Sequence, residues 1–172
     1  GDGGTGVFLQ DGGTHTVNDN LYLGRSLNGT DGDGAYTLNS GSLTVGTESI
    51  GDAGTGAFNQ NGGTHTVSGD LILGDDAGDA TYTLTGGTLN VGNIVNGSGN
   101  SSFHFKEGTL NLTGSSMDVD TFNLGYATGS NASFTLGGGQ TVTAGTENIG
   151  HQGGAGVFIQ DGGTHTVDNL SL

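Results

Sequence analysis

The chain has 172 residues, with 39 glycines, no proline, no cysteine and a formal net charge of −15. Its only basic residues other than histidine are Arg25 and Lys106, so it lacks the cationic surface that nucleic acids and anionic membranes require. We therefore predict no nucleic-acid partner and no membrane insertion. Only 30% of the residues are hydrophobic, too few for a large globular core but enough for a thin column of stacked side chains.

The chain is an array of one small unit. The octapeptide Gln-Asp-Gly-Gly-Thr-His-Thr-Val occurs at 10–17 and 160–167 and, with Asn61 in place of Asp, at 60–67. A smaller unit, an aromatic residue followed by a glycine turn, recurs seven times with a mean spacing of 25 residues. Its aromatic residues are Phe8, Tyr36, Phe58, Tyr82, Phe103, Phe134 and Phe158. Repeats of this length are typical of solenoids.

Short strands with a period-2 pattern follow each aromatic residue. The first strand of a unit is clearest at 13–17 and 42–45, and the second at 21–23, 49–50, 71–73 and 122–124. The variable spacing is expected in loops at 25–34, 74–80, 113–120 and 125–132. We predict an all-β fold, a right-handed parallel β-helix (β-solenoid) of about seven rungs. It forms one domain over residues 1–172, uncapped at both ends.

Three segments resemble the repeats of bacterial secreted β-solenoids. They are GTESIG (46–51), GTGAFNQNGGTHTVSGDLILG (54–74) and ATYTLTGGTLNVG (80–92). These relatives are autotransporter-passenger-like and sorting-signal-bearing exoproteins built of Gly-Gly-Thr strand repeats. The resemblance implies a right-handed parallel β-helix, an extracellular or cell-surface location, and a passive structural or adhesive role. It implies no catalytic residue.

A coupled substitution marks the interior. Units one, three and seven carry the pairs Gln10/His15, Gln60/His65 and Gln160/His165, where units two and four carry leucine pairs. Because the histidine has the parity of an interior leucine, we predict a buried Gln–His pair rather than a metal or catalytic site.

Hydroxyl and amide side chains flank this interior position. All are expected on one flat outward face, which is an alternative binding face for carbohydrate or ice. Its threonines are Thr14, Thr16, Thr44, Thr64, Thr66, Thr88, Thr109, Thr164 and Thr166, and Thr141 and Thr143 join them if one inserted residue is allowed.

Acidic loops offer the oxygen ligands that calcium accepts. The five candidate residues are Asp31, Asp33, Asp75, Asp76 and Asp79. They lack the Gly-Gly-x-Gly-x-Asp repeat of calcium β-rolls, so only a weak site is expected, and no other cofactor is predicted.

The two terminal units resemble one another and place apolar residues outward. Unit seven repeats unit one almost residue for residue, and neither contains a capping helix. We predict a self-assembly interface between these ends. Its residues are Val7, Phe8, Leu9, Gln10 and His15 at one end, and Val157, Phe158, Ile159, Gln160, His165, Leu170 and Leu172 at the other.

The predicted function is therefore that of a secreted structural protein, the subunit of a head-to-tail extracellular homopolymer. The alternative is a surface adhesin or binding rod that uses the threonine ladder, including the case of a fragment of a longer exoprotein. An enzyme is not predicted. Polysaccharide lyases and hydrolases on this fold need a basic residue beside calcium or a carboxylate pair in a groove. Here Arg25 and Lys106 lie in different rungs, and the carboxylates are expected in turns rather than on a strand face.

Overall fold

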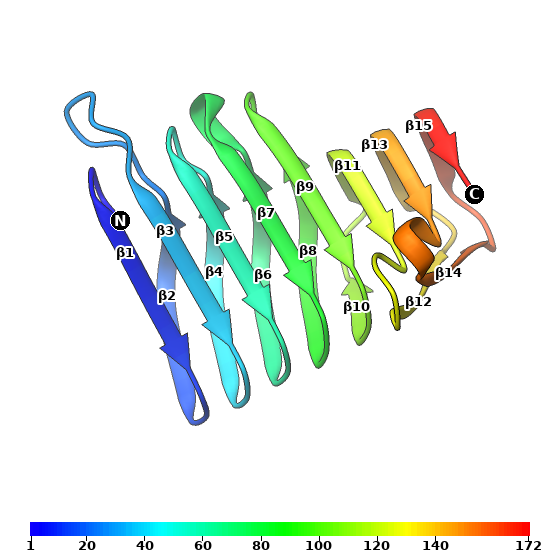
Figure 1. Cartoon of the computed structure of the whole chain (residues 1–172), viewed down its shortest axis with the longest axis horizontal. Coiled ribbons are helices and arrows are strands. Elements are labelled where there is room, and N and C mark those ends of the chain that lie inside the picture. The colour runs from blue at the N-terminus through cyan, green and yellow to red at the C-terminus, as the bar shows by residue number, and fades with distance from the viewer.

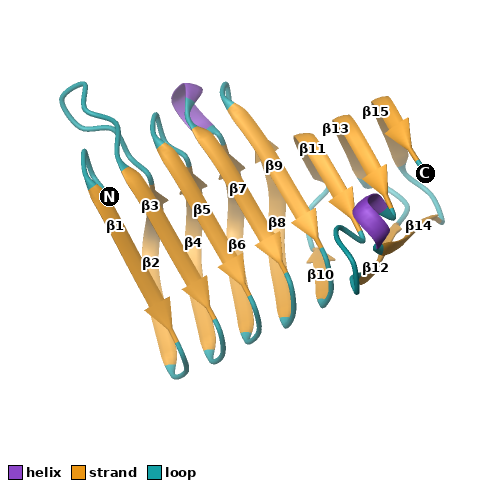
Figure 2. Ribbon diagram, viewed as in Figure 1, coloured by secondary structure: helices purple, strands orange, loops and turns teal.

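The computed structural model describes all of residues 1–172 as a single rod of stacked parallel strands, with the N- and C-terminus at opposite ends (Figure 1). Strands and tight turns account for nearly the whole chain (Figure 2). The two exceptions are one-turn 3₁₀ helices, η1 (Asp75–Ala77) and η2 (His151–Gly153). No helix is both long enough and apolar enough to span a lipid bilayer.

The strands, in chain order, are β1 (Thr5–Gln10), β2 (Thr14–Leu23), β3 (Asp33–Leu38), β4 (Ser42–Ile50), β5 (Thr55–Gln60), β6 (Thr64–Leu73), β7 (Asp79–Leu84), β8 (Thr88–Asn96), β9 (Asn100–Phe105), β10 (Thr109–Leu112), β11 (Ser116–Leu124), β12 (Asn131–Leu136), β13 (Thr141–Ile149), β14 (Ala155–Gln160) and β15 (Thr164–Ser171). All pairings between them are parallel, and about seven turns lie some 23 residues apart. The predicted parallel β-solenoid is confirmed, with a shorter mean turn than the expected 25 residues.

Each turn of the solenoid has three segments, which build three faces. Face 1 begins with β1, β3, β5, β7 and β9. Face 2 begins with the first halves of β2, β4, β6 and β8, and face 3 begins with their second halves. The strands bend between the two halves, and the register of the β2–β4, β4–β6 and β6–β8 pairings shifts there. A glycine turn joins face 1 to face 2. Gly63 in this turn has φ +68°, and a Cβ atom there would lie 2.6 Å from the Gly41 carbonyl oxygen of the previous rung.

Alternate side chains of all three faces point inward and stack on their counterparts in the next rung. On face 1 the rings of Tyr36, Phe58 and Tyr82 stack nearly parallel, with centroids 5.0 and 4.9 Å apart. Leucine, valine and isoleucine from faces 2 and 3 fill the rest of one continuous core. A rung of three short strands can therefore be buried with few apolar residues.

The repeat moves by one face at β11. Its first half continues face 3, where Met117 pairs with Ile94, and its second half continues face 1, where Phe122 pairs with Phe103. The expected loop at 113–120 is thus wrong in part, because residues 116–120 belong to β11. From there on the aromatic strands β12 and β14 follow face 2 instead of face 1.

The shift explains the mean spacing. Phe134 follows Phe103 after 31 residues, which is one full turn and one further face rather than a turn with a long loop. Phe134 accordingly packs edge-on against Phe122 and reaches Phe158 on its other side. The seven aromatic residues of the repeat therefore do not all lie on one face, since the last two, Phe134 and Phe158, lie on face 2.

Candidate functional site

A buried polar cluster in the middle of the rod is the most unusual chemical feature of the interior. His65 Nδ1 lies 3.0 Å from the Tyr82 hydroxyl, which donates to Gln60 Oε1 at 2.6 Å. Because that hydroxyl proton is committed to Gln60, His65 Nδ1 carries its proton and donates to Tyr82. Gln60 Nε2 in turn donates to the Thr88 carbonyl oxygen at 2.9 Å. The chain of donors therefore runs from His65 to the backbone of the next rung.

Glu48 contacts the other nitrogen of this histidine. Its Oε2 lies 3.3 Å from His65 Nε2, and both side chains are fully buried, although the two atoms are not aligned as a hydrogen bond. Burial raises the pKa of the Glu48 carboxyl well above its ordinary value and lowers the pKa of His65 to about 3. Burial therefore favours the neutral form of both groups.

The first rung holds the same arrangement without a glutamate. Tyr36 donates to Gln10 Oε1 at 2.5 Å and accepts from His15 Nδ1 at 2.9 Å. Gln10 Nε2 reaches the Ser42 carbonyl oxygen at 3.0 Å. No glutamate contacts His15 within the chain.

The last rung contains the glutamate but lacks the tyrosine. His165 Nε2 lies 2.7 Å from Glu147 Oε2, and the rings of Phe158 and His165 stack with centroids 4.3 Å apart. Burial raises the pKa of Glu147, and the neighbouring His165 opposes that shift. Gln160 Nε2 makes one long contact of 3.4 Å to the Gly163 carbonyl oxygen, and no tyrosine contacts either Gln160 or His165.

In units one and three the predicted Gln–His pair is therefore joined through a tyrosine rather than directly. In unit seven the prediction of a buried pair is wrong, because Gln160 is exposed. From the sequence, Tyr36 and Tyr82 were identified only as aromatic members of the repeat, and Glu48 and Glu147 were overlooked. A signal was present for both types of residue. Tyrosine follows each of the first two Gln/His units, and the glutamates occupy matching places in GTESIG and GTENIG.

Tyr82→Phe tests the cluster directly. The change removes the hydroxyl that pairs both Gln60 and His65, so we expect the free energy of unfolding to fall by about 1–3 kcal/mol. Denaturant titration at pH 7 measures the loss. Tyr126→Phe is the matched control, because the Tyr126 hydroxyl makes no hydrogen bond, and it should change stability by less than about 0.5 kcal/mol. Equal effects of the two changes contradict the cluster.

The two ends of the rod carry every large hydrophobic side chain that is exposed. At the first rung these are Val7 (75% exposed), Phe8, Leu9, Tyr22 and Leu27, and at the last they are Val157, Ile159, Leu170 and Leu172. β1 pairs only with β3 and β2 only with β4, while β14 pairs only with β12 and β15 only with β13. Each end thus presents a row of backbone groups beside apolar side chains.

The threonine ladder lies on two faces rather than one. Thr14/Thr16, Ser42/Thr44, Thr64/Thr66, Thr88/Asn90 and Thr109/Asn111 pair in register along face 2. Thr141/Thr143 and Thr164/Thr166 pair with each other and with Ser116/Asp118 along face 3. The expected single flat face is wrong, because the shift at β11 moves the last rungs by one face.

The acidic loops do not form a cluster in the structure. Nowhere do three or more His, Asp or Glu side chains gather in a way that could hold a metal ion. Asp79 accepts from Asn100 Nδ2 at 2.6 Å, and Asp75 accepts from the Asp76 backbone N–H at 3.0 Å. The carboxylates of Asp31 and Asp33 make no hydrogen bond to Asp75, Asp76 or Asp79. A weak calcium site remains a prediction.

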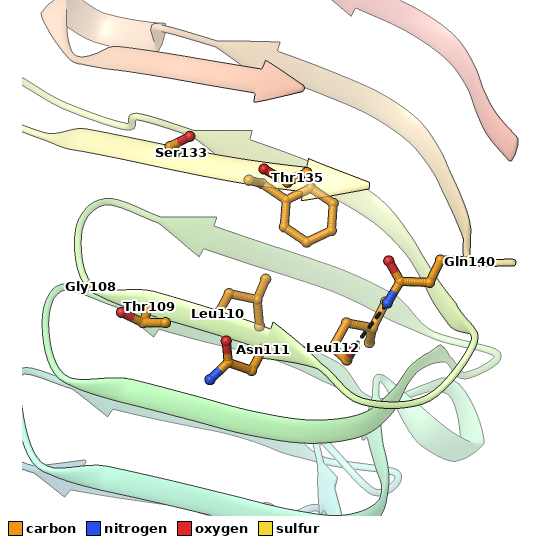
Figure 3. A pocket seen from close by; sticks show the side chains of 9 residues that line it. Gly108, Thr109, Leu110, Asn111, Leu112, Ser133, Thr135 and Gln140 are labelled. Carbon is orange, nitrogen blue, oxygen red and sulfur yellow. Dashed lines mark hydrogen bonds between the residues drawn. The ribbon is translucent and has the colours of Figure 1, made fainter. Parts of the chain in front are cut away.

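A cleft of about 430 Å³ opens in face 2 where the repeat shifts. Figure 3 shows Leu110 and Leu112 on β10 and Ser133 and Thr135 on β12 lining it from opposite sides. The two strands are consecutive on this face but do not pair, and only Gln140 bridges them, by donating to the Leu112 carbonyl oxygen at 2.9 Å.

Comparison of the chain with protein-family models, curated proteins and solved structures finds no match.

Proposed function

We propose that the protein is a structural rod that assembles end to end, the last rung of one copy on the first rung of the next. The observation that carries this proposal is the confinement of all exposed large hydrophobic side chains to the two terminal rungs. An unpaired strand edge beside apolar side chains is a template for further strand pairing. A head-to-tail contact of this kind does not close into a ring and propagates as a fibre.

The outward residues of the two terminal rungs match one another. β14 and β1 occupy the same place in the repeat but lie on faces 2 and 1. Stacking with the second copy turned by one face about the rod axis therefore sets Val157 beside Val7 and Ile159 beside Leu9. The inner rungs carry Ala35, Ala57 or Ser133 at the first of these positions. The apolar pairs therefore belong to the ends alone, which supports a second copy as the partner.

A secreted, extracellular or cell-surface location fits the same proposal, as does membership of the bacterial exoproteins that the Gly-Gly-Thr repeats resemble. The acidic surface, with a net charge of −15, keeps rods apart sideways and leaves the ends as the contact. The alternative of an adhesin or ice-binding rod depended on one flat threonine face, which the structure divides.

Electron microscopy of the purified chain at neutral pH tests the proposal. We expect filaments with an axial repeat of roughly 34 Å, seven rungs of about 4.8 Å each. The double change Val7→Glu and Val157→Glu places like charges side by side at the junction and should weaken association at least about ten-fold. Ala57→Glu is the control, since it puts the same charge at the same outward position of an inner rung. The control should still form filaments. Filaments that survive the double change contradict this junction.

A further inference from the structure

The interior obeys a matching rule between consecutive rungs. The Gln/His pairs of units one and three are each covered by a tyrosine of the next rung, Gln10/His15 by Tyr36 and Gln60/His65 by Tyr82. Where a rung carries leucine at both positions, the next rung supplies phenylalanine instead. Leu38/Leu43 precede Phe58, and Leu84/Leu89 precede Phe103.

Hydrogen bonding explains the rule. A tyrosine hydroxyl donates to the glutamine carbonyl oxygen and accepts from the histidine N–H, so two buried polar groups are satisfied at once. Phenylalanine in its place leaves both groups unpaired. Tyrosine over a leucine pair buries a hydroxyl that has no partner. Each rung therefore selects the aromatic residue of the rung that covers it.

The last rung presents the same half of the interface to the outside. Phe158 stacks on His165 at 4.3 Å as Phe58 stacks on His65 at 4.5 Å. Glu147 contacts His165 Nε2, as Glu48 contacts His65. Gln160 Nε2 keeps its 3.4 Å contact to Gly163, as Gln60 does to Gly63. These contacts repeat those of the complete cluster, except that His165 lies closer to its glutamate, at 2.7 Å against 3.3 Å for His65. In the complete cluster the tyrosine comes from the next rung.

We propose that the C-terminal end of the rod, formed by Phe158, Gln160 and His165, selects a second solenoid chain whose first rung carries tyrosine at the stacked aromatic position. This inference rests on the proposed end-to-end function. It continues an interface that the chain already repeats between its own rungs. The first rung of an identical copy supplies the matching outer residues Val7 and Leu9, but its Phe8 lacks the hydroxyl.

Phe8→Tyr in the full chain provides the tyrosine rung as a defined probe. Phe8 occupies the register of Tyr36, so its hydroxyl in a stacked copy falls between Gln160 and His165 of the neighbour. We expect end-to-end association, followed by sedimentation velocity, to tighten about ten-fold. Phe58→Tyr is the matched control: it places the same hydroxyl over Leu38 and Leu43 and should not tighten association.

The reciprocal change reverses the preference. With Gln160→Leu and His165→Leu the last rung becomes a leucine rung, and a chain with Phe8 should then associate more tightly than the same chain with Phe8→Tyr. A hydroxyl effect that is absent, or equal in both backgrounds, while the wild-type chain associates overturns the inference and leaves the proposed function standing. If no chain associates through its ends, Phe8→Tyr included, both are overturned.

Discussion

Replacing Phe58 by alanine is expected to lower the free energy of unfolding by about 3–5 kcal/mol. Phe58 is fully buried, and its ring contacts three others, with centroids 5.0 Å from Tyr36, 4.9 Å from Tyr82 and 4.5 Å from His65. The cavity lies in the third of about seven rungs and interrupts the aromatic column of face 1 between the rungs on either side. Thermal unfolding followed by circular dichroism should show a midpoint roughly 10 °C lower.

Phe134→Ala is the matched control for this prediction. Phe134 occupies the same place in its repeat, but it lines the cleft between β10 and β12. Truncating it enlarges a space that is already open to water, so less apolar surface loses its neighbours. We expect a loss of less than half that of Phe58→Ala. Equal losses contradict the cleft and indicate that face 2 is closed there.

The period-2 pattern and the glycine turns predict the strands well because they are local properties. Thr64–Val67, for example, alternates outward and inward side chains and follows a turn that needs a glycine at positive φ. The same pattern carries no information on which face a strand occupies. The residues from 113 to 120 read as a loop because Ser116–Val119 is short and polar in alternation, which suits both an insertion and an extra third of a turn.

The polar clusters around the histidines were predictable only in part, because contacts within one repeat unit can be read from the sequence and contacts between rungs cannot. Gln60 and His65 stand in one unit, so their pairing is suggested by adjacent positions of one repeat. Tyr82 and Glu48 belong to the rungs on either side, 17 residues from His65 in each direction. Their contact depends on the register between rungs, which the shift at β11 shows cannot be counted from aromatic spacing alone.

The pH dependence of stability should separate the two buried titrating groups. Burial raises the pKa of Glu48, so the folded chain holds this proton to a higher pH than the unfolded chain, whose carboxyl loses it above about pH 4.5. Its contribution to stability therefore falls as the pH rises above that value. Glu48→Gln stays neutral throughout, so we expect it to stabilise the protein at pH 7 relative to the wild-type chain, and this gain should vanish below about pH 4.5.

His65 has the opposite sign, and Glu48→Gln exposes it. The pKa of His65 falls to about 3 in the folded chain, whereas the unfolded imidazole takes up a proton below about pH 6.5. Stability from this group is complete above pH 6.5 and is lost as the pH falls toward 3, by up to about 1.4 kcal/mol per pH unit. Denaturant titrations of Glu48→Gln at pH 7, 6, 5 and 4 measure the slope.

The reference for this slope is a variant that also carries Gln60→Leu, His65→Leu and Tyr82→Phe, which copies the leucine rung and its phenylalanine cover. Both proteins share all other carboxylates, so the difference between their stabilities isolates His65. The stability of Glu48→Gln relative to this reference should fall between pH 6.5 and 4, because only the histidine variant weakens. A constant difference over this range contradicts a neutral, buried His65, and shows that the imidazole takes up its proton equally well in the folded and the unfolded chain.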